Sequence, residues 1–252
     1  PRAPIPVKWL HRKEHVAHMI NETAPANDLR TVMLIGAHPD DPEFGCAATV
    51  AKWAQEGRQI EYVLLTSGDK GSHDPVVRPG QIAARREEEQ RAAAQELGVR
   101  AVKFLNYPDG MLENTMDLRR HICGIIRRHK PDILLAIDPW RRYQLHPDHR
   151  VAGQVAIDAV YAAREWYIFP EQLGDEEPWR VKEIYLYWTD SPDFWVDVTE
   201  SIETRIAALA RHSSQLRGNN DERAERIRKM ARETGEPHGY AYAEGFKRIT
   251  LR

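Results

Sequence analysis

Runs of apolar residues alternate with longer helix-forming stretches along most of the chain. The first run, TVMLIGA at residues 31–37, is a continuous apolar run, which is typical of a parallel strand that is covered on both faces. Gly57 and Gly98 close the first two helix-forming stretches. The predicted strands are 31–37, 60–66, 102–105, 132–137 and 184–188. The predicted helices are 46–56, 81–97, 116–128, 149–163, 200–212 and 221–233.

This alternation predicts an α/β fold, with a Rossmann-like, doubly wound and mostly parallel sheet and helices on both faces. Right-handed crossovers limit the topology, and the common doubly wound strand order is 3-2-1-4-5. Ligands bind such sheets where the order reverses, here between the first and fourth strands. The loops that follow Ala37 and Ile137 are therefore expected to face each other.

The chain of 252 residues is long enough for one such domain. We expect a single domain over 1–252, with an N-terminal extension at 1–30, a core sheet at 31–190 and a helical C-terminal part at 191–252.

Composition and charge narrow the functional classes. The 36 Lys and Arg residues against 38 Asp and Glu leave a net charge of −2, which argues against a nucleic-acid partner that needs a strongly basic surface. No apolar run approaches the roughly 20 residues that span a bilayer, so no membrane partner is expected. Cys46 and Cys123 form no CxxC pair, which favours reduced thiols and a cytoplasmic location.

Candidate chemistry lies in the two loops at the predicted crevice. The first reads AHPDDPEFG at 37–45, and the second contains HPDH at 146–149. Only Gly36 stands where a dinucleotide-binding fold needs GxGxxG, so nicotinamide or flavin binding is not expected.

Imidazole and carboxylate ligands suit zinc, and a catalytic zinc keeps three protein ligands and a water. His38, Asp41 and His149 would make such a set. Asp40 could take a proton from the bound water, and His146 could donate a hydrogen bond to a tetrahedral intermediate. This is metal-assisted hydrolysis with general acid–base help.

Three other interpretations remain open at this point. A His-Pro-Asp segment can be a turn that caps the next helix, although two such segments at one crevice favour a site. His38, Asp40 and His149 also match the two-histidine, one-carboxylate set of an Fe(II) enzyme, which the α/β pattern disfavours. The crevice could instead belong to a non-catalytic module that binds a small ligand.

Several segments together carry a family resemblance: AHPDDPEFG, TSGDKG, RREEEQRAAAQELGV, NYPDGML, HPDHR, HSSQ and YAEGFKRI. Over about residues 31–249 the chain resembles the LmbE/PIG-L family of zinc-dependent N-deacetylases. The paired AHPDD and HPDH motifs are highly specific for that family. The resemblance implies one Zn²⁺ per chain and removal of an N-acetyl group from an amino sugar or its conjugate.

The resemblance also implies roles for individual residues. His38, Asp41 and His149 would bind zinc, Asp40 would be the general base, and His146 would stabilise the oxyanion.

Three further residues receive roles in the same way. Asp148 would orient His146 from outside the metal-binding set, and Arg86 and Asp109 would bind sugar hydroxyls.

The chain departs from the family pattern at two positions. Glu43 is displaced by Pro42 from the place directly after the second Asp, so it is given no catalytic part. Gln144 stands where some members have a Tyr that polarises the carbonyl, with Tyr143 beside it. The aromatic residues of the C-terminal third are compatible with a homo-oligomer.

Overall fold

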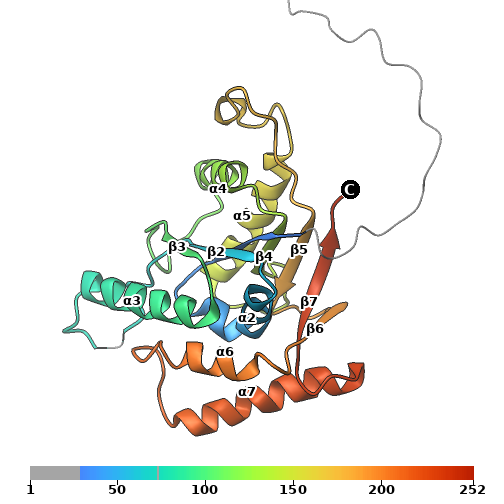
Figure 1. Cartoon of the computed structure of the whole chain (residues 1–252). Coiled ribbons are helices and arrows are strands. Elements are labelled where there is room, and N and C mark those ends of the chain that lie inside the picture. The colour runs from blue at the N-terminus through green and yellow to red at the C-terminus, as the bar shows by residue number, and fades with distance from the viewer. Residues whose placement is uncertain (1–28, 73) are drawn as a thin grey trace, which may run out of the picture.

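The computed structural model describes residues 29–72 and 74–252, so most of the expected N-terminal extension lies outside the described residues (Figure 1). The strands are β1 (Thr31–Gly36), β2 (Gln59–Leu64), β3 (Ala101–Phe104), β4 (Ile133–Ile137), β5 (Glu183–Tyr187), β6 (Phe194–Asp197) and β7 (Ala243–Thr250). The α-helices are α1 (Asp41–Gly45), α2 (Ala47–Gln55), α3 (Pro79–Leu97), α4 (Met116–His129), α5 (Pro147–Ala163), α6 (Ile202–Leu209) and α7 (Asn220–Gly235). Two 3-10 turns, η2 (Pro170–Gln172) and η3 (Glu236–His238), complete the described elements.

The strands form one sheet in the order β3-β2-β1-β4-β5-β7-β6. The first five strands of this order run parallel, which confirms the predicted order 3-2-1-4-5. β1 lies between β2 and β4, with Ile35 of β1 opposite Ala136 of β4. The order reverses between β1 and β4, so the loops that follow these two strands lie side by side at one edge of the sheet.

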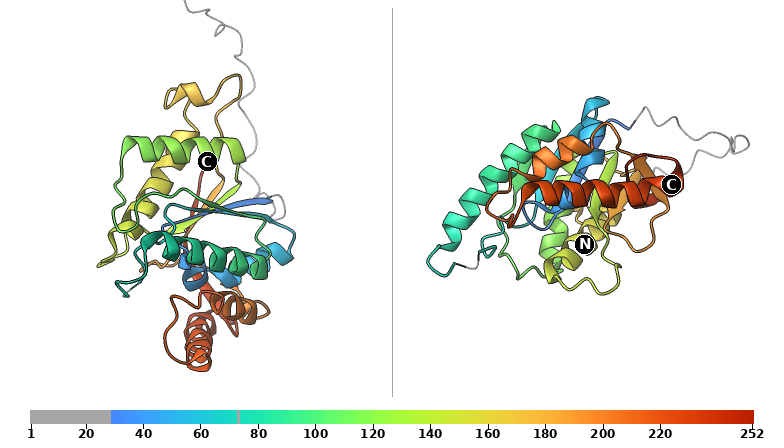
Figure 2. Two further views of the ribbon diagram at one scale, coloured as in Figure 1. Left: turned by 90° about the vertical axis from the view of Figure 1, so that its left-hand side faces the viewer. Right: turned by 90° about the horizontal axis from the view of Figure 1, so that it is seen from below.

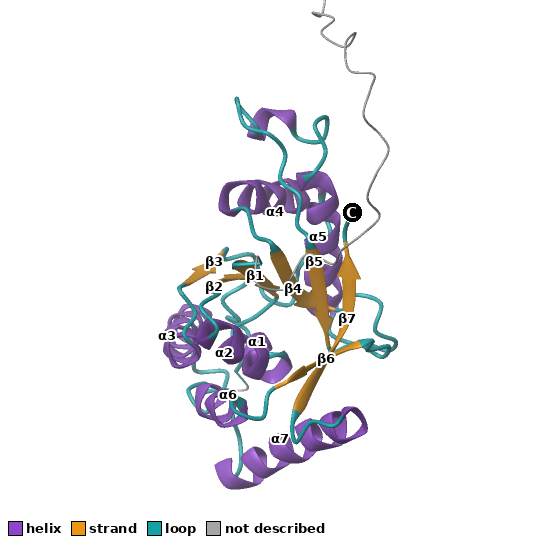
Figure 3. Ribbon diagram, turned by 45° about the vertical axis from the view of Figure 1, so that its right-hand side comes forward, coloured by secondary structure: helices purple, strands orange, loops and turns teal. Residues whose placement is uncertain are grey.

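Strands β6 and β7 were not predicted, and the C-terminal part is therefore not purely helical. β7 pairs antiparallel with β5 and with β6, and together they extend the parallel sheet (Figure 3). Buried and exposed positions mix along β7, and its C-terminal half carries Lys247 and Arg248. Such a segment lacks the continuous apolar run that marks a strand covered on both faces.

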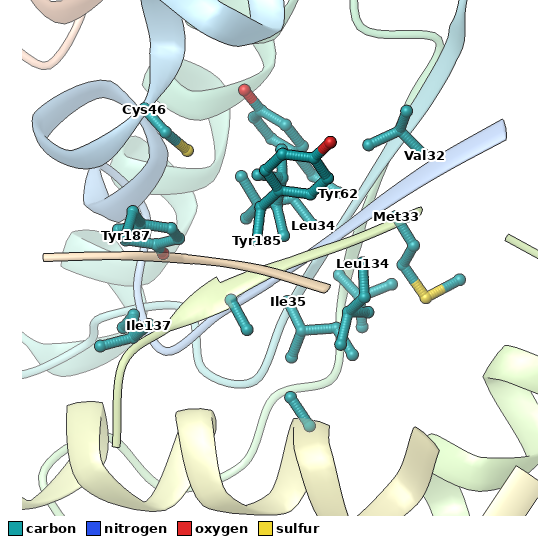
Figure 4. Packing of buried hydrophobic residues seen from close by; sticks show 14 of the residues in the cluster. Val32, Met33, Leu34, Ile35, Cys46, Tyr62, Leu134, Ile137, Tyr185 and Tyr187 are labelled. Carbon is teal, nitrogen blue, oxygen red and sulfur yellow. The ribbon is translucent and has the colours of Figure 1, made fainter. Parts of the chain in front are cut away.

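Helices cover both faces of the sheet, as predicted. α4 and α5 pack together on one face, whereas α2, α3 and α6 lie on the other (Figures 1 and 2). The core is continuous through the sheet, where Leu34 and Ile35 of β1 pack near Leu134 and Ile137 of β4 (Figure 4). None of the helices in the described part of the chain combines the length and the apolar composition needed to cross a bilayer.

The C-terminal strand β7 also fixes the helices that follow β1. Its buried Glu244 accepts hydrogen bonds from the backbone N–H groups of Ala48 and Thr49, at 3.1 and 2.7 Å, in the first turn of α2. A carboxylate is favourable there because the first N–H groups of a helix have no partners within the helix. Arg205 of α6 binds Glu244 at 2.8 Å and donates to the backbone oxygen of Phe44 at 2.7 Å. The end of α1 and the start of α2 are thus tied to the C-terminal part.

Candidate metal and catalytic site

The predicted ligands converge from the two loops at the edge where the strand order reverses. α1 begins at Asp41, immediately after the β1 loop. α5 begins at Pro147, two residues before the predicted start, with His146 at the N-cap. Proline suits the first helical position because its missing N–H would be unpaired there in any case. The first turn of α5 therefore carries His149 toward the β1 loop.

Asp41 lies between two of the histidines. Its Oδ1 is 3.2 Å from Nε2 of His149, and its Oδ2 is 3.7 Å from Nδ1 of His38. Oδ2 also accepts the backbone N–H groups of Ala37 and His38, both at 2.9 Å. Burial alone would raise the pKa of Asp41, but His149 and His38 outweigh burial and hold that pKa far below its usual range. The side chain is thus an ionised carboxylate between two imidazoles.

The opposite nitrogen of His38 faces two other carboxylates. Nε2 lies 3.0 Å from Oδ2 of Asp148 and 3.1 Å from Oδ1 of Asp109. Burial lowers the pKa of His38, but its contacts with Asp109, Asp148 and Asp41 outweigh burial and raise it to about 11. A proton held on Nε2 by these carboxylates leaves Nδ1, which faces Asp41, as the metal-binding nitrogen.

Asp148 is fully buried, and backbone N–H groups bind both of its oxygens. Its oxygens accept the backbone N–H groups of Gly110 at 2.6 Å and Leu112 at 3.1 Å. The sequence-based role pairs Asp148 with His146, but within the described residues the ring nitrogen that Asp148 reaches is Nε2 of His38. Asp148 therefore supports a predicted metal ligand directly.

Two groups of side chains bring potential ligand atoms within 4.8 Å of one another. One is His38, His146 and His149, and the other is His38, Asp109 and Asp148. The second group is explained by the support of His38, since both carboxylates face the same Nε2 and Asp148 also binds two backbone N–H groups. The first group, with Asp41 in contact with two of its histidines, has the imidazole and carboxylate donors that suit zinc.

Asp40 occupies a strained position next to these ligands. Its φ is 88°, a left-handed value that side chains other than glycine adopt rarely. Its N–H donates to Oε1 of Gln90 at 2.8 Å, and its Oδ2 lies 3.2 Å from the guanidinium of Arg86. Burial raises the pKa of Asp40 to about 6, although Arg86 opposes the shift.

Within the part of the chain that the structure describes, Asp40 belongs to neither group of potential ligands. Its ionic partner is Arg86, whereas Asp41 is the carboxylate that contacts the histidines. The geometry therefore favours Asp41 over Asp40 as a ligand, and the Fe(II) set that needs Asp40 gains no support.

Arg86 is buried, and its guanidinium spans the loops after β1 and β2. It donates to the backbone oxygen of Pro39 at 2.6 Å and to that of Gly68 at 3.0 Å. A Cβ on Gly68 would lie 2.1 Å from Nη1 of Arg86, so the glycine is needed for this approach. In this arrangement the guanidinium holds two loops and the Asp40 carboxylate, and its predicted contact with sugar hydroxyls stays a prediction.

Asp109 is also buried, and it joins the loop after β3 to His38. Its Oδ2 accepts the backbone N–H of Lys70 at 2.8 Å, while Oδ1 faces His38. Burial alone would raise its pKa, but the contacts with His38 and Lys70 lower it to about 2. The contact of Asp109 with sugar hydroxyls likewise stays a prediction.

His146 is the exposed member of the histidine group. Its ring stacks on that of His149, with centroids 4.5 Å apart. Burial and the neighbouring His38 and His149 lower its pKa, which favours the neutral ring. Oε1 of Gln144 accepts the backbone N–H of His146 at 3.4 Å, whereas Tyr143 is exposed to solvent.

Sequence reasoning missed two residues at the site. Gln90 of α3 accepts a hydrogen bond from the N–H of Asp40. It lies in a highly charged helix and belongs to no motif whose spacing would distinguish it from its neighbours. Trp188 is half-buried, with its ring centroid 5.2 Å from that of His149. The sequence offered one signal for Trp188: it directly follows β5, the strand that pairs with β4 in the sheet.

Comparison with known proteins decides the family. The sequence model of the PIG-L family, described as GlcNAc-PI de-N-acetylase, matches residues 33–160. The chain belongs to the PIG-L family. The matched segment contains all eight residues to which the sequence assigned site roles, and the resemblance to N-deacetylases is confirmed.

Individual relatives match this chain over longer segments. The diacetylchitobiose deacetylase of Thermococcus kodakarensis is 35% identical over 230 residues, which cover 90% of this chain and 85% of the relative. The 1D-myo-inositol 2-acetamido-2-deoxy-alpha-D-glucopyranoside deacetylase of Streptomyces avermitilis is 31% identical over 188 residues, covering 65% of this chain and 62% of the relative.

Solved structures share the fold of this chain. N,N'-diacetylchitobiose deacetylase from Pyrococcus horikoshii superposes with a TM-score of 0.84 at 33% identity, covering 90% of this chain and 86% of that chain. A 4-carboxy-2-hydroxymuconate hydratase from Pseudomonas putida reaches a TM-score of 0.73 at 20% identity, covering 88% and 97%. That second likeness shows the shared fold alone.

Proposed function

We propose that this chain is a zinc-dependent hydrolase that removes the N-acetyl group from an amino sugar or an amino-sugar conjugate. The observation that carries the proposal is the convergence of His38, Asp41 and His149, with the buried carboxylate of Asp148 behind His38. Two imidazoles and a carboxylate are a ligand set for catalytic zinc, and a carboxylate behind a histidine is typical of metal sites. Bound zinc would polarise the amide carbonyl and the attacking water.

The residues around this ligand set have distinct tasks. Asp40 takes the proton of the attacking water and returns a proton to the leaving amine. His146, with its exposed ring stacked on His149, donates a hydrogen bond to the oxyanion. Arg86 holds the Asp40 carboxylate in place. The reaction therefore needs one side chain for proton transfer and another for charge stabilisation.

Chito-oligosaccharides are the first substrate class to test, because the match to the Thermococcus deacetylase spans more of both chains than the match to the inositol conjugate deacetylase. The buried thiols of Cys46 and Cys123 support a cytoplasmic location. A homo-oligomer would bury part of the exposed aromatic surface, which includes Trp166 and Tyr167.

The test is acetate release from a panel of N-acetylated sugars, including diacetylchitobiose, N-acetylglucosamine and its inositol conjugate. We expect release from at least one sugar, loss of release after chelation, and recovery when Zn²⁺ is added back. Oxygen consumption with Fe²⁺ serves as the parallel measurement for the oxygenase interpretation. Stoichiometric sugar binding without acetate release would support the binding module instead.

A further inference from the structure

A chain of buried hydrogen bonds connects the loop after α6 with the backbone of Asp40. Nε2 of His212 lies 3.0 Å from Oε2 of Glu43. Oε1 of Glu43 accepts a hydrogen bond from Nε2 of Gln90 at 3.0 Å. Oε1 of Gln90 in turn accepts the N–H of Asp40 at 2.8 Å. We call His212, Glu43 and Gln90 the buried relay; they come from the loop after α6, from α1 and from α3.

All three side chains of the buried relay are completely inaccessible to solvent. Polar groups in such a place have no water to replace a lost partner, so each hydrogen bond depends on the others. Burial of three polar side chains is costly unless the network is complete. If the contact between α1, α3 and the C-terminal part served only to hold these elements together, apolar side chains could fill the same space.

The relay has a defined direction of donation. The N–H of Asp40 can only donate, so Gln90 must present its carbonyl oxygen and turn its NH₂ group toward Glu43. This NH₂ group donates to Oε1 of Glu43, and with Glu43 as a carboxylate its Oε2 accepts from Nε2 of His212. Nδ1 of His212 has no hydrogen-bond partner among the described residues, which agrees with an unprotonated Nδ1.

The relay ends at Asp40, whose φ of 88° is left-handed. A left-handed φ at a residue with a Cβ costs about 1–3 kcal/mol and persists only where the surroundings hold it. Gln90 holds the backbone N–H of Asp40 and Arg86 holds its carboxylate. The orientation of Asp40 therefore depends on a side chain that lies 50 positions away in the sequence and on what supports that side chain.

We propose that His212, Glu43 and Gln90 are positioning residues that hold Asp40 in the conformation from which its carboxylate transfers protons. This inference rests on the proposed function, because it assigns the relay to the proton-transfer step of that reaction. The relay contacts Asp40 through its backbone, so its loss misplaces the base while the predicted metal ligands remain.

The first comparison replaces His212 in two ways. His212→Leu removes the donor to Glu43, whereas His212→Gln can present an N–H near the position of Nε2. We expect His212→Leu to lower kcat by roughly tenfold to a hundredfold, the scale of a misplaced catalytic group, with KM changed less than about threefold. Bound zinc per chain should be unchanged, and His212→Gln should recover most of kcat.

Glu43→Gln is the second variant, and it keeps the size of the side chain. The NH₂ group of the new glutamine must face either His212 or Gln90, and both of these side chains already donate a hydrogen bond at that position. One hydrogen bond of the relay is therefore lost, and we expect kcat to fall as it does in His212→Leu. Glu43→Gln carries the comparison if His212→Leu does not fold. Ser213→Ala is the matched control, because this neighbour of His212 binds Glu89 and is not part of the relay, and its kcat should be that of the unaltered protein.

The deciding measurement combines His212→Leu with Asp40→Asn. If the relay acts through Asp40, the double variant should have the kcat of Asp40→Asn alone. The positioning role of the relay would be contradicted if the kcat loss of the double variant equalled the product of the losses of the two single variants. It would also be contradicted if kcat were unaltered in both His212→Leu and Glu43→Gln. Absence of zinc-dependent acetate release by the unaltered protein would instead overturn the proposed function, so the two failures are told apart.

Discussion

His38 and Asp148 are 110 positions apart in the sequence, yet Nε2 of the first lies 3.0 Å from Oδ2 of the second. This contact joins the loop after β1 to the first turn of α5. It also selects which nitrogen of His38 remains for a metal, because the carboxylate holds a proton on the opposite side of the ring. The orientation of one predicted ligand is therefore set by a side chain from the other motif.

Replacing Asp148 should weaken metal binding. In Asp148→Asn the amide cannot match both the backbone N–H donors and Nε2 of His38, so the imidazole loses its anionic partner. We expect zinc affinity to fall roughly tenfold to a hundredfold, as measured by competition with a chromophoric chelator. Asp158→Asn on the same helix is the control. Equal zinc affinities in the two variants would contradict the assignment of Asp148.

Replacing Asp40 should separate turnover from metal binding. Asp40→Asn keeps the side-chain shape and the Arg86 contact but removes the proton acceptor. We expect acetate release to fall by about 100-fold to 10,000-fold while bound zinc per chain is unchanged. The measurements are initial rates and metal analysis on the same samples. A near-normal rate would show that another group is the base.

Replacing Arg86 should destabilise the loops that it holds. Arg86→Ala leaves the buried oxygens of Pro39 and Gly68 without their partner, which costs roughly 1–3 kcal/mol for each group left unpaired. A Tm decrease of several degrees should follow in thermal denaturation. The neighbouring Arg85 is mostly exposed and pairs with Glu89, so Arg85→Ala should change stability by less than about 1 kcal/mol. Similar Tm values for the two variants would argue against the holding role.

Asp132 should make stability depend on pH. Burial opposes ionisation, but hydrogen bonds from Lys182, Thr31 and Arg30 outweigh it and lower the pKa of this carboxyl group. A lowered folded-state pKa adds stability above the unfolded value of about 3.9 and loses it as the pH falls through the folded value. The stability difference between the unaltered protein and Asp132→Asn should therefore shrink below about pH 4 in urea unfolding. A difference that is constant with pH would contradict this.

The central sheet was predictable because its signals are local. Continuous apolar runs mark β1 and β4, and the right-handed crossover rule then brings their following loops together. The positions of His38, Asp41 and His149 follow from that topology. By contrast, β6 has only four residues and β7 has an exposed, charged half, so neither carries a clear strand pattern.

Pairings between buried polar side chains were not predictable in the same way. The family resemblance implied that Asp148 orients His146, but the histidine that Asp148 contacts comes from the β1 loop. Glu43 received no role because Pro42 displaces it from the usual position, yet its contact with His212 spans 169 positions. Such contacts depend on the packing of whole helices, which spacing within one motif does not describe.

The dependence of α1 and α2 on Glu244, Arg205 and His212 has a consequence for biosynthesis. A nascent chain that has been translated through α5 already contains every predicted zinc ligand. It still lacks the carboxylate at the start of α2, the guanidinium that binds Phe44 and the imidazole that supports Glu43. These three contacts can form only after the C-terminal segment has left the ribosome, so the growing chain contains its predicted ligands before it contains the side chains that hold α1 and α2.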